Sequence, residues 1–343
     1  MSGPRHRREP GTLPRPVAFL VALTLAGATG AAITLLPADA ADRPGSAPPA
    51  PAALSTSPAR QAGRDGPSGF VRFVDTAREP GLDLPADARR TGLRWYALGH
   101  VVAGAEECTP AWSGRLDPVA DPVGRLRALG ADAVVVFGGP GGRELAATCT
   151  RPGALASAYR GVVGALGVRS VDFEVRDGAD RAVVLRRARA VHALQRERPL
   201  RAGFTLTLRP YGLAARDVAM LRLTREQGVR VGTVNLLVTI ESRDAAEGRM
   251  ARLAAAVSAA RGQIARALGP TGHAVAAGGQ HTVTTGAGHG VALTLVSAGS
   301  GDLSEVDAGE LAVFAVRQEP AWVSLRGAAS GSAVFRALWS ASG

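Results

Sequence analysis

The sequence contains no lysine. All 40 basic residues of the 343-residue chain are arginine, and the formal charge at pH 7 is +11. Proteins that bind nucleic acids typically gather their basic residues in one tract with interleaved aromatic side chains. Here the arginines are scattered beside acidic residues along helix-like stretches such as 181–189, and aromatic residues make up only 4% of the chain. This distribution argues against nucleic-acid binding and favours a solvated basic surface.

Several common catalytic and binding motifs are also absent. The chain has no Gly-x-Ser-x-Gly elbow and no indication of a Cys/His nucleophile pair. The segment FGGPGGRE, which starts at Phe137, lacks the Gly-Lys-Ser/Thr ending of a phosphate-binding loop, so we interpret it as a tight turn. His273, His281 and His289 lie in a Gly-rich stretch without a nearby cysteine or acidic ligand. We therefore expect no metal site and no cofactor.

The N-terminal residues have the pattern of an export signal. Four arginines precede an apolar run over residues 17–36, and Ala38-Asp39-Ala40 has the small-x-small form of a signal-peptidase site. The run is nearly long enough to span a membrane, so residues 1–40 are either a cleaved signal peptide or a retained signal anchor. Residues 41–68 are rich in Pro, Ala and Ser and are predicted to be a linker. We expect a protein that is secreted, or held outside the cytoplasm by residues 17–36.

The chain has only two cysteines, Cys108 and Cys149. An oxidising compartment would allow them to form a disulfide, which would stabilise the fold by about 3–4 kcal/mol. Two free buried thiols are the alternative.

After the linker, short apolar segments alternate with amphipathic ones. The predicted strands are Val71–Asp75, Leu93–Val102, Ala133–Gly139, Ser170–Val175, Ala202–Leu208, Thr233–Val238, Val291–Ser297 and Ala321–Leu325. The predicted helices between them include Ala154–Leu166, Ala179–Arg196, Ala214–Gly228, Glu247–Leu268 and Asp307–Gln318. Eight such units in about 275 residues predict a closed parallel α/β barrel of the (β/α)8 TIM type, with a doubly wound open sheet as the alternative.

One of these strands ends in charged residues. The segment VDFEVRDG alternates so that Asp172, Glu174 and Arg176 share one face, while Phe173 and Val175 share the other. In a parallel barrel, chemistry takes place where strands end and the following loops begin. The charged face of this segment is therefore a candidate site.

A set of segments in this part of the chain carries a family resemblance. They are FVDTAREPGLDL, YALGHVVAGAEECTPAW, VVVFGGPGGRELAATC, SVDFEVRDG, FTLTLRPYGLAARDVAMLRLTREQGVRVGTVNLL and AWVSLRG. In order and spacing they resemble bacterial chitinases of glycoside hydrolase family 18, above all secreted enzymes with a Cys-x-Pro-x-Trp segment after the second strand. The resemblance covers residues 70–335. It implies one chitinase-like TIM barrel over residues 69–343, expected to be a monomer, and a chitin-like polysaccharide or oligosaccharide as partner.

The resemblance also identifies where this chain departs from the family. The family strand reads Asp-Phe-Asp-Ile-Glu, in which the Glu protonates the glycosidic oxygen while the preceding Asp holds the substrate's N-acetyl group. These three acidic positions fall on Asp172, Glu174 and Arg176. A guanidinium stays protonated far above neutral pH, so Arg176 cannot be the acid. The motif is degenerate, and we expect Glu174 and Arg176 to form an ion pair.

Two other family positions have changed. After the sixth strand the chain keeps Val234 and Asn235, but Ile240 and Glu241 stand where the family has an Asp-Tyr pair. Val136 stands at the Ser position of the family's Ser-x-Gly-Gly segment. Changes on three separate strands suggest that selection for hydrolysis has lapsed.

Three hypotheses for the function follow. The first is a non-hydrolytic binder of chitin-like or peptidoglycan-like glycans, in which Trp322 floors the sugar site as the family's last-strand Trp does, and Asp172, Glu174, Arg176 and Asn235 contribute to binding. Ordinary barrel packing is the alternative role for Trp322. The second is a working hydrolase with a relocated acid, either Asp177 or Glu241, although Asp177 could instead belong to the start of the next helix. The third is a surface scaffold that binds protein.

Overall fold

The computed structural model describes residues 66–114, 121–151, 153–176, 178–241, 247–269, 289–297, 304–327 and 337–340. The predicted export signal and all but the last three residues of the predicted linker lie outside these ranges. Within the described ranges, every helix is too short or too polar to cross a bilayer.

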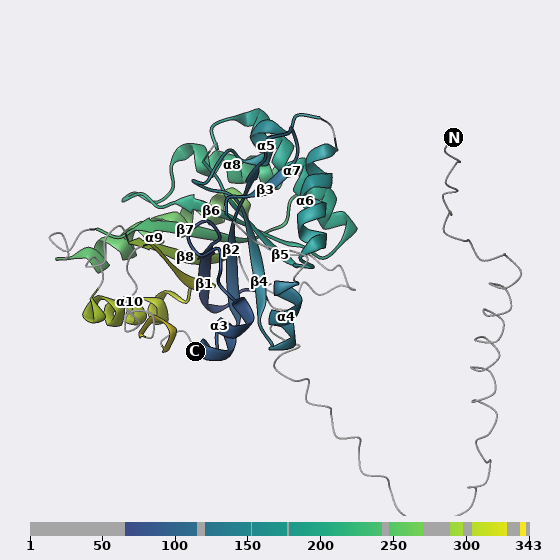
Figure 1. Ribbon diagram of the computed structural model, residues 1–343. Coiled ribbons are helices and arrows are strands. Elements are labelled where there is room, and N and C mark those ends of the chain that lie inside the picture. Colours follow the sequence, from purple (N-terminus) through teal and green to yellow (C-terminus); the bar gives the residue numbers. More distant parts are fainter. Residues whose placement is uncertain are drawn as a thin grey trace, which may run out of the picture. The chain divides into compact units, whose positions relative to one another are not determined.

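The strands form a closed barrel (Figure 1). Its eight parallel strands are β1 (Gly69–Asp75), β2 (Trp95–Ala103), β4 (Asp132–Gly138), β5 (Ser170–Glu174), β6 (Arg201–Thr207), β7 (Val231–Thr239), β8 (Gly290–Ser297) and β9 (Trp322–Gly327). Neighbouring strands pair in sequence order, and β1 pairs with both β2 and β9, which closes the sheet. The predicted (β/α)8 barrel is confirmed, and the open doubly wound sheet is excluded because the sheet closes.

One strand was not expected from the sequence. β3 (Pro110–Trp112) pairs antiparallel with the end of β2, with Trp112 opposite Val101. A three-residue strand carries too little alternation to be found by pattern, and its hydrogen bonds come from a hairpin that extends β2 beyond the barrel.

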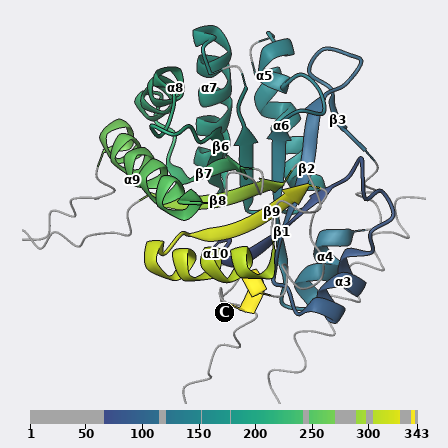
Figure 2. The ribbon, with the colours of Figure 1, turned by 90° about the vertical axis from the view of Figure 1, so that its left-hand side faces the viewer.

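Helices surround the barrel (Figure 2). They are α3 (Leu84–Thr91), α4 (Pro122–Ala128), α5 (Leu145–Thr148), α6 (Ala154–Ala165), α7 (Arg181–Glu197), α8 (Ala215–Glu226), α9 (Arg249–Leu268) and α10 (Glu305–Gln318). The starts of α3 and α7 have a local cause, because Asp83 accepts a hydrogen bond from Ala86 N and Asp180 accepts bonds from Ala182 N and Val183 N.

The two faces of the strands have different surroundings. Outward-facing residues such as Phe173 and Phe204 pack under the helices in the larger core. Inward-facing residues such as Val71, Ala97 and Val136 pack with one another inside the barrel. Because side chains alternate along a strand, every second residue of β5 points into the barrel, and this places Asp172 and Glu174 there.

Candidate functional site

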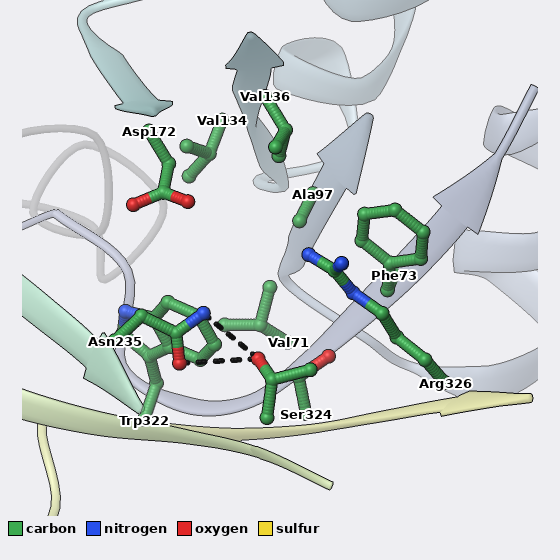
Figure 3. Close-up of a pocket in the computed structure, with 11 residues that line it drawn as sticks. Val71, Phe73, Ala97, Val134, Val136, Asp172, Asn235, Trp322, Ser324 and Arg326 are labelled. Carbon is green, nitrogen blue, oxygen red and sulfur yellow. Dashed lines mark hydrogen bonds between the residues drawn. The ribbon is translucent and has the colours of Figure 1, made fainter. Parts of the chain in front are cut away.

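A belt of hydrogen-bonded polar side chains crosses the barrel interior. Asp172, Thr205, Asn235 and Thr294 come from the adjacent strands β5, β6, β7 and β8, and each is at most 5% exposed. Thr205 Oγ1 donates to the Asp172 carboxylate, and Asn235 Nδ2 donates to Thr205 Oγ1 at 2.8 Å. Asn235 and Thr294 bond each other, with Nδ2 2.9 Å from Oγ1. The belt brings Asp172 and Asn235, two of the predicted site residues, into one network through Thr205. Figure 3 shows both side chains among the residues that line the barrel interior.

The Asp172 carboxyl is held where ionisation is unfavourable. Burial raises its pKa to about 6, and the neighbouring charge of Glu174 adds to the rise. The hydrogen bond from Thr205 and the positive charge of Arg326 oppose this rise without cancelling it. Asp172 is therefore an acid that titrates close to neutral pH.

Glu174 lies above this belt, at the end of β5, and has two partners. His100 Nε2 lies 3.0 Å from Glu174 Oε2, and Arg326 Nη1 donates to the same oxygen at 2.5 Å. The Arg326 guanidinium also lies 3.6 Å from the centroid of the Phe73 ring, close enough for a cation–π contact. Side-chain exposure is only 4% for His100, 5% for Glu174 and 11% for Arg326. These three groups fill the mouth end of the barrel interior, and we call them the mouth triad.

The mouth triad keeps Glu174 ionised. Burial alone would raise the pKa of Glu174, but the hydrogen bond from His100 and the positive charge of Arg326 outweigh burial and lower the pKa to about 2. Gly139 lets His100 take its place in the triad, because a Cβ at this position would lie 2.4 Å from His100 Cδ2.

The predicted ion pair between Glu174 and Arg176 is wrong. Strand β5 ends at Glu174, and Arg176 lies exposed in the bend that follows. Glu174 instead binds His100 and Arg326, which lie 74 and 152 residues away in the sequence. Sequence reasoning had no local signal for either partner, since barrel closure alone brings β2 and β9 to this point.

Below the mouth triad, the interior is almost full. A cavity of about 10 Å³, room for about one water molecule, remains among residues that include Asp172, Asn235, Trp322 and Ser324. Ser324 Oγ and Arg326 Nε are buried without a hydrogen-bond partner in the described part of the chain. A sugar ring does not fit into this cavity.

Trp322 lies at the opposite end of β9 from Arg326. It is 6% exposed and packs with Trp95, Val71 and Ala292. Arg326 lies four positions further along the strand, or about 13 Å away. In this conformation the indole contributes to barrel packing, and its predicted role as a sugar floor remains a prediction that requires the mouth to open.

Comparison with known proteins agrees with this architecture. No family model matches the chain. A curated relative, the "Probable bifunctional chitinase/lysozyme" of Escherichia coli (strain K12), is 26% identical over 180 residues, which are 49% of this chain and 20% of that protein. The chain thus spans about a fifth of that relative's length.

Among solved structures, the catalytic domain of a hyperthermophilic chitinase from Pyrococcus furiosus superposes with a TM-score of 0.59 at 22% identity, covering 81% of this chain and 97% of that domain. The protein has a chitinase-like barrel. A xylanase–α-amylase inhibitor protein, solved with trehalose, has the same general fold at a TM-score of 0.50 and 12% identity, covering 76% of this chain and 93% of its own. Catalytic-site mutants of the Pyrococcus furiosus active domain 2 were also solved with chito-oligosaccharides, with a TM-score of 0.56 at 22% identity, covering 76% of this chain and 83% of that chain.

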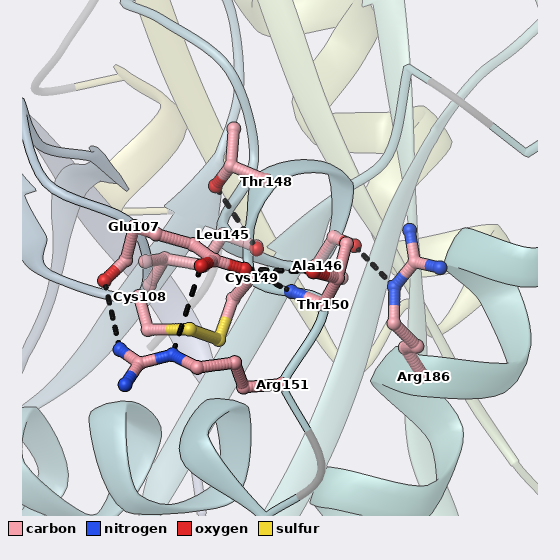
Figure 4. The surroundings of a disulfide bond; sticks show 9 residues. All are labelled: Glu107, Cys108, Leu145, Ala146, Thr148, Cys149, Thr150, Arg151 and Arg186. Atoms are coloured by element: carbon pink, nitrogen blue, oxygen red, sulfur yellow. Dashed lines mark hydrogen bonds and ion pairs between the residues drawn. A yellow bond between two sulfur atoms is a disulfide. The ribbon is translucent and has the colours of Figure 1, made fainter.

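The disulfide of the chitinase-like barrel is formed as predicted (Figure 4). Cys108 and Cys149 are bonded, with their Cα atoms 4.4 Å apart, and the free-thiol alternative is excluded. Next to the bond, the Glu107 carboxylate accepts hydrogen bonds from the backbone N and the hydroxyl of Thr150. The bridge ties the β2–β3 loop to the end of α5, and it is typical of proteins outside the cytoplasm.

Of the two relocated-acid candidates, the structure describes only Glu241, and its surroundings do not suit proton donation. Glu241 follows β7 and is half-exposed, and the hydrogen bond from Arg252 lowers its pKa. A low pKa leaves this carboxylate without a proton to donate at neutral pH. Asp177 lies outside the described residues. Asp180, three residues later, caps the start of α7. A helix start is the alternative role that the sequence suggested for Asp177.

The histidines of the Gly-rich stretch were the candidate metal ligands in the sequence. His289 lies 2.9 Å from Val231 O through Nδ1 and 3.1 Å from Gly269 O through Nε2, so both ring nitrogens contact backbone. His273 and His281 lie outside the described residues. In the part of the chain that the structure covers, no cluster of three His, Cys, Asp or Glu residues could hold a metal ion.

Proposed function

We propose that this protein is an exported, divergent member of glycoside hydrolase family 18 that binds N-acetylated glycans without cleaving them. The observation that carries the proposal is Arg176. It occupies the family's acid position by resemblance, and it is an exposed guanidinium at the end of β5. A guanidinium cannot supply the proton that a departing sugar oxygen needs.

The packing of the barrel mouth supports the same proposal. Substrate-assisted hydrolysis needs room for a sugar ring beside the acid and the carboxylate that precedes it. Here Glu174, at the position of that second carboxylate, is bound by Arg326 and His100, and Arg326 covers Phe73. Glycan binding would therefore use the rim and loops of the barrel, and deeper contacts with Asp172, Asn235 or Trp322 would require the mouth triad to separate.

The test combines binding and cleavage on one sample. Chitin hexamer is titrated into the full-length protein by calorimetry, and the mixture is then analysed for shorter products by mass spectrometry. We expect a saturating heat and an intact hexamer. An Arg176→Gln variant, which removes the charge without restoring an acid, should also leave the hexamer intact.

Two results would contradict the proposal. Cleavage by the wild type that is lost in Glu241→Ala or Asp177→Ala would establish a hydrolase with a relocated acid. No binding of any N-acetylated glycan would leave a protein-binding scaffold, a role compatible with the fold that the inhibitor protein shares.

Localisation belongs to the same proposal. Residues 17–36 would direct export and then be removed with the signal peptide, or would remain as an anchor. Either outcome leaves the disulfide-bonded barrel outside the cytoplasm. N-terminal sequencing of the exported protein decides between them.

A further inference from the structure

Two exposed arginines follow neighbouring strands on one side of the barrel mouth. Arg176 follows β5 and Arg209 follows β6, and both side chains are exposed. The two strands are neighbours, with Glu174 paired to Thr205 and Val175 N bonded to Thr205 O at 3.1 Å. Neighbouring parallel strands lie about 4.8 Å apart, and the two arginines follow adjacent strands, with Arg209 two residues beyond the position level with Arg176.

Two acidic groups near these arginines have other partners, while a third, Asp217 of α8, interacts electrostatically with Arg209, whose charge opposes the rise in the Asp217 pKa that burial causes. Glu174 binds Arg326 and His100, and Glu241 binds Arg252. Within the described ranges, neither Arg176 nor Arg209 forms an ion pair. Two guanidinium groups at the rim are thus available to an anionic ligand, and their planar donors fit carboxylates.

A pocket adjoins Arg209. It has a volume of about 290 Å³ and lies between the ends of β6 and β7 and helix α9. Its walls are mainly apolar and include Ile240, Leu253 and Leu311, while its lining residues contribute three arginines and one carboxylate. A volume of this size is at the lower end of the range of about 300–1,000 Å³ for small-molecule pockets, and it suits one acyl-bearing sugar unit.

The turn between β6 and α8, which contains Arg209, presents an exposed ring. Tyr211 is 64% exposed, and the turn is closed by hydrogen bonds between Arg209 and Gly212 in both directions, at 2.7 and 2.9 Å. Gln263 of α9 fixes it by accepting from Leu213 N at 2.6 Å. A rigid, exposed tyrosine face suits stacking on the apolar face of a pyranose.

We propose that the glycan bound by this protein is anionic. Carboxylates on its sugar rings bind Arg176 and Arg209, one ring stacks on Tyr211, and an N-acyl sugar occupies the adjoining pocket. This inference rests on the proposed glycan-binding function and narrows its ligand class from neutral chitin-like chains to acidic N-acylated glycans. Charge complementarity at the rim and the apolar pocket beside it are the two observations that carry it.

The test uses two glycans with the same backbone. One is a chitin tetramer, and the other is a peptide-free peptidoglycan tetrasaccharide, whose alternate rings carry a lactyl carboxylate. Each is titrated into the full-length protein by calorimetry at low and at high salt. We expect the acidic tetramer to bind about tenfold more tightly at low salt, and its advantage to shrink as salt screens the rim charges.

Variants then locate the charge recognition. Arg176→Gln and Arg209→Gln should each reduce affinity for the acidic tetramer by about threefold to tenfold, and should reduce it more than they reduce affinity for chitin. Arg189→Gln is the matched control, because it removes the same charge from an exposed position on α7, on the outside of the barrel. Thermal unfolding of each variant checks that the fold is intact.

The outcomes separate this inference from the function on which it rests. Equal affinity for both tetramers, with no effect of Arg176→Gln or Arg209→Gln, would overturn the anionic-ligand inference and leave glycan binding standing. Binding of the acidic tetramer alone would support the inference and restrict the proposed function. Binding of neither would overturn both.

Discussion

Replacing Asp172 by Asn should remove a pH-dependent loss of folding stability that arises inside the barrel. The carboxyl is 5% exposed, and burial raises its pKa from 3.8 to about 6. The folded state therefore holds the proton more tightly than the unfolded state. The contribution of this proton to the free energy of unfolding is fully present below about pH 4 and is lost as the pH rises through about 6. A shift of about two pKa units corresponds to about 3 kcal/mol.

The asparagine amide has the same shape and cannot ionise. Its oxygen can still accept the hydrogen bond from Thr205, so the variant should not weaken between pH 4 and pH 8 in the way that the wild type does. Relative to the wild type, Asp172→Asn should gain about 3 kcal/mol in the free energy of unfolding over this pH range.

Urea unfolding at pH 4, 5, 6, 7 and 8 measures this difference directly. Asp83→Asn is the control, because this exposed residue caps α3 and asparagine caps about as well, so its effect should stay within about 0.5 kcal/mol at every pH. If the difference between wild type and Asp172→Asn is the same at pH 4 and pH 8, the reasoning about burial is refuted.

Two further perturbations test the mouth triad and the disulfide. Arg326→Met should cost about 3–5 kcal/mol at pH 7 by leaving Glu174 buried with one partner fewer, as measured by urea unfolding. Because the pKa of Glu174 is lowered to about 2, its ionised form stabilises the fold above about pH 4.5. The stability cost of Arg326→Met should therefore shrink as the pH falls toward 2. A cost that does not change with pH would contradict this account. Replacing Cys108 and Cys149 together by Ser opens a loop with a sequence separation of 41 and should lower stability by about 4 kcal/mol. Thermal unfolding with and without reductant checks this, and a variant as stable as the oxidised wild type would disprove it.

The sequence predicted the barrel strands well and the short elements poorly. All eight barrel strands were predicted within a few residues of their observed bounds, because burial on both faces requires apolar runs that are visible locally. The helices α3, α4 and α5 and the strand β3 were missed, and they have only eight, seven, four and three residues. Such short elements show too few periods of their pattern to stand out from loops.

For the candidate site, the sequence by itself determined which charged residues end β5, and the tertiary structure decided which contacts they make. That Arg176 stands at the position of the family's acid is a prediction from the resemblance, made from VDFEVRDG without any fold. The partners of Glu174 are not local, because His100 and Arg326 come from strands that only barrel closure brings beside β5. The same holds for the rim: the alternation of β5 suggested that Arg176 would point inward, but the strand ends at Glu174 and the side chain is exposed. Where a strand stops depends on the hydrogen bonds that its neighbours offer, and these are fixed only when the whole sheet has formed.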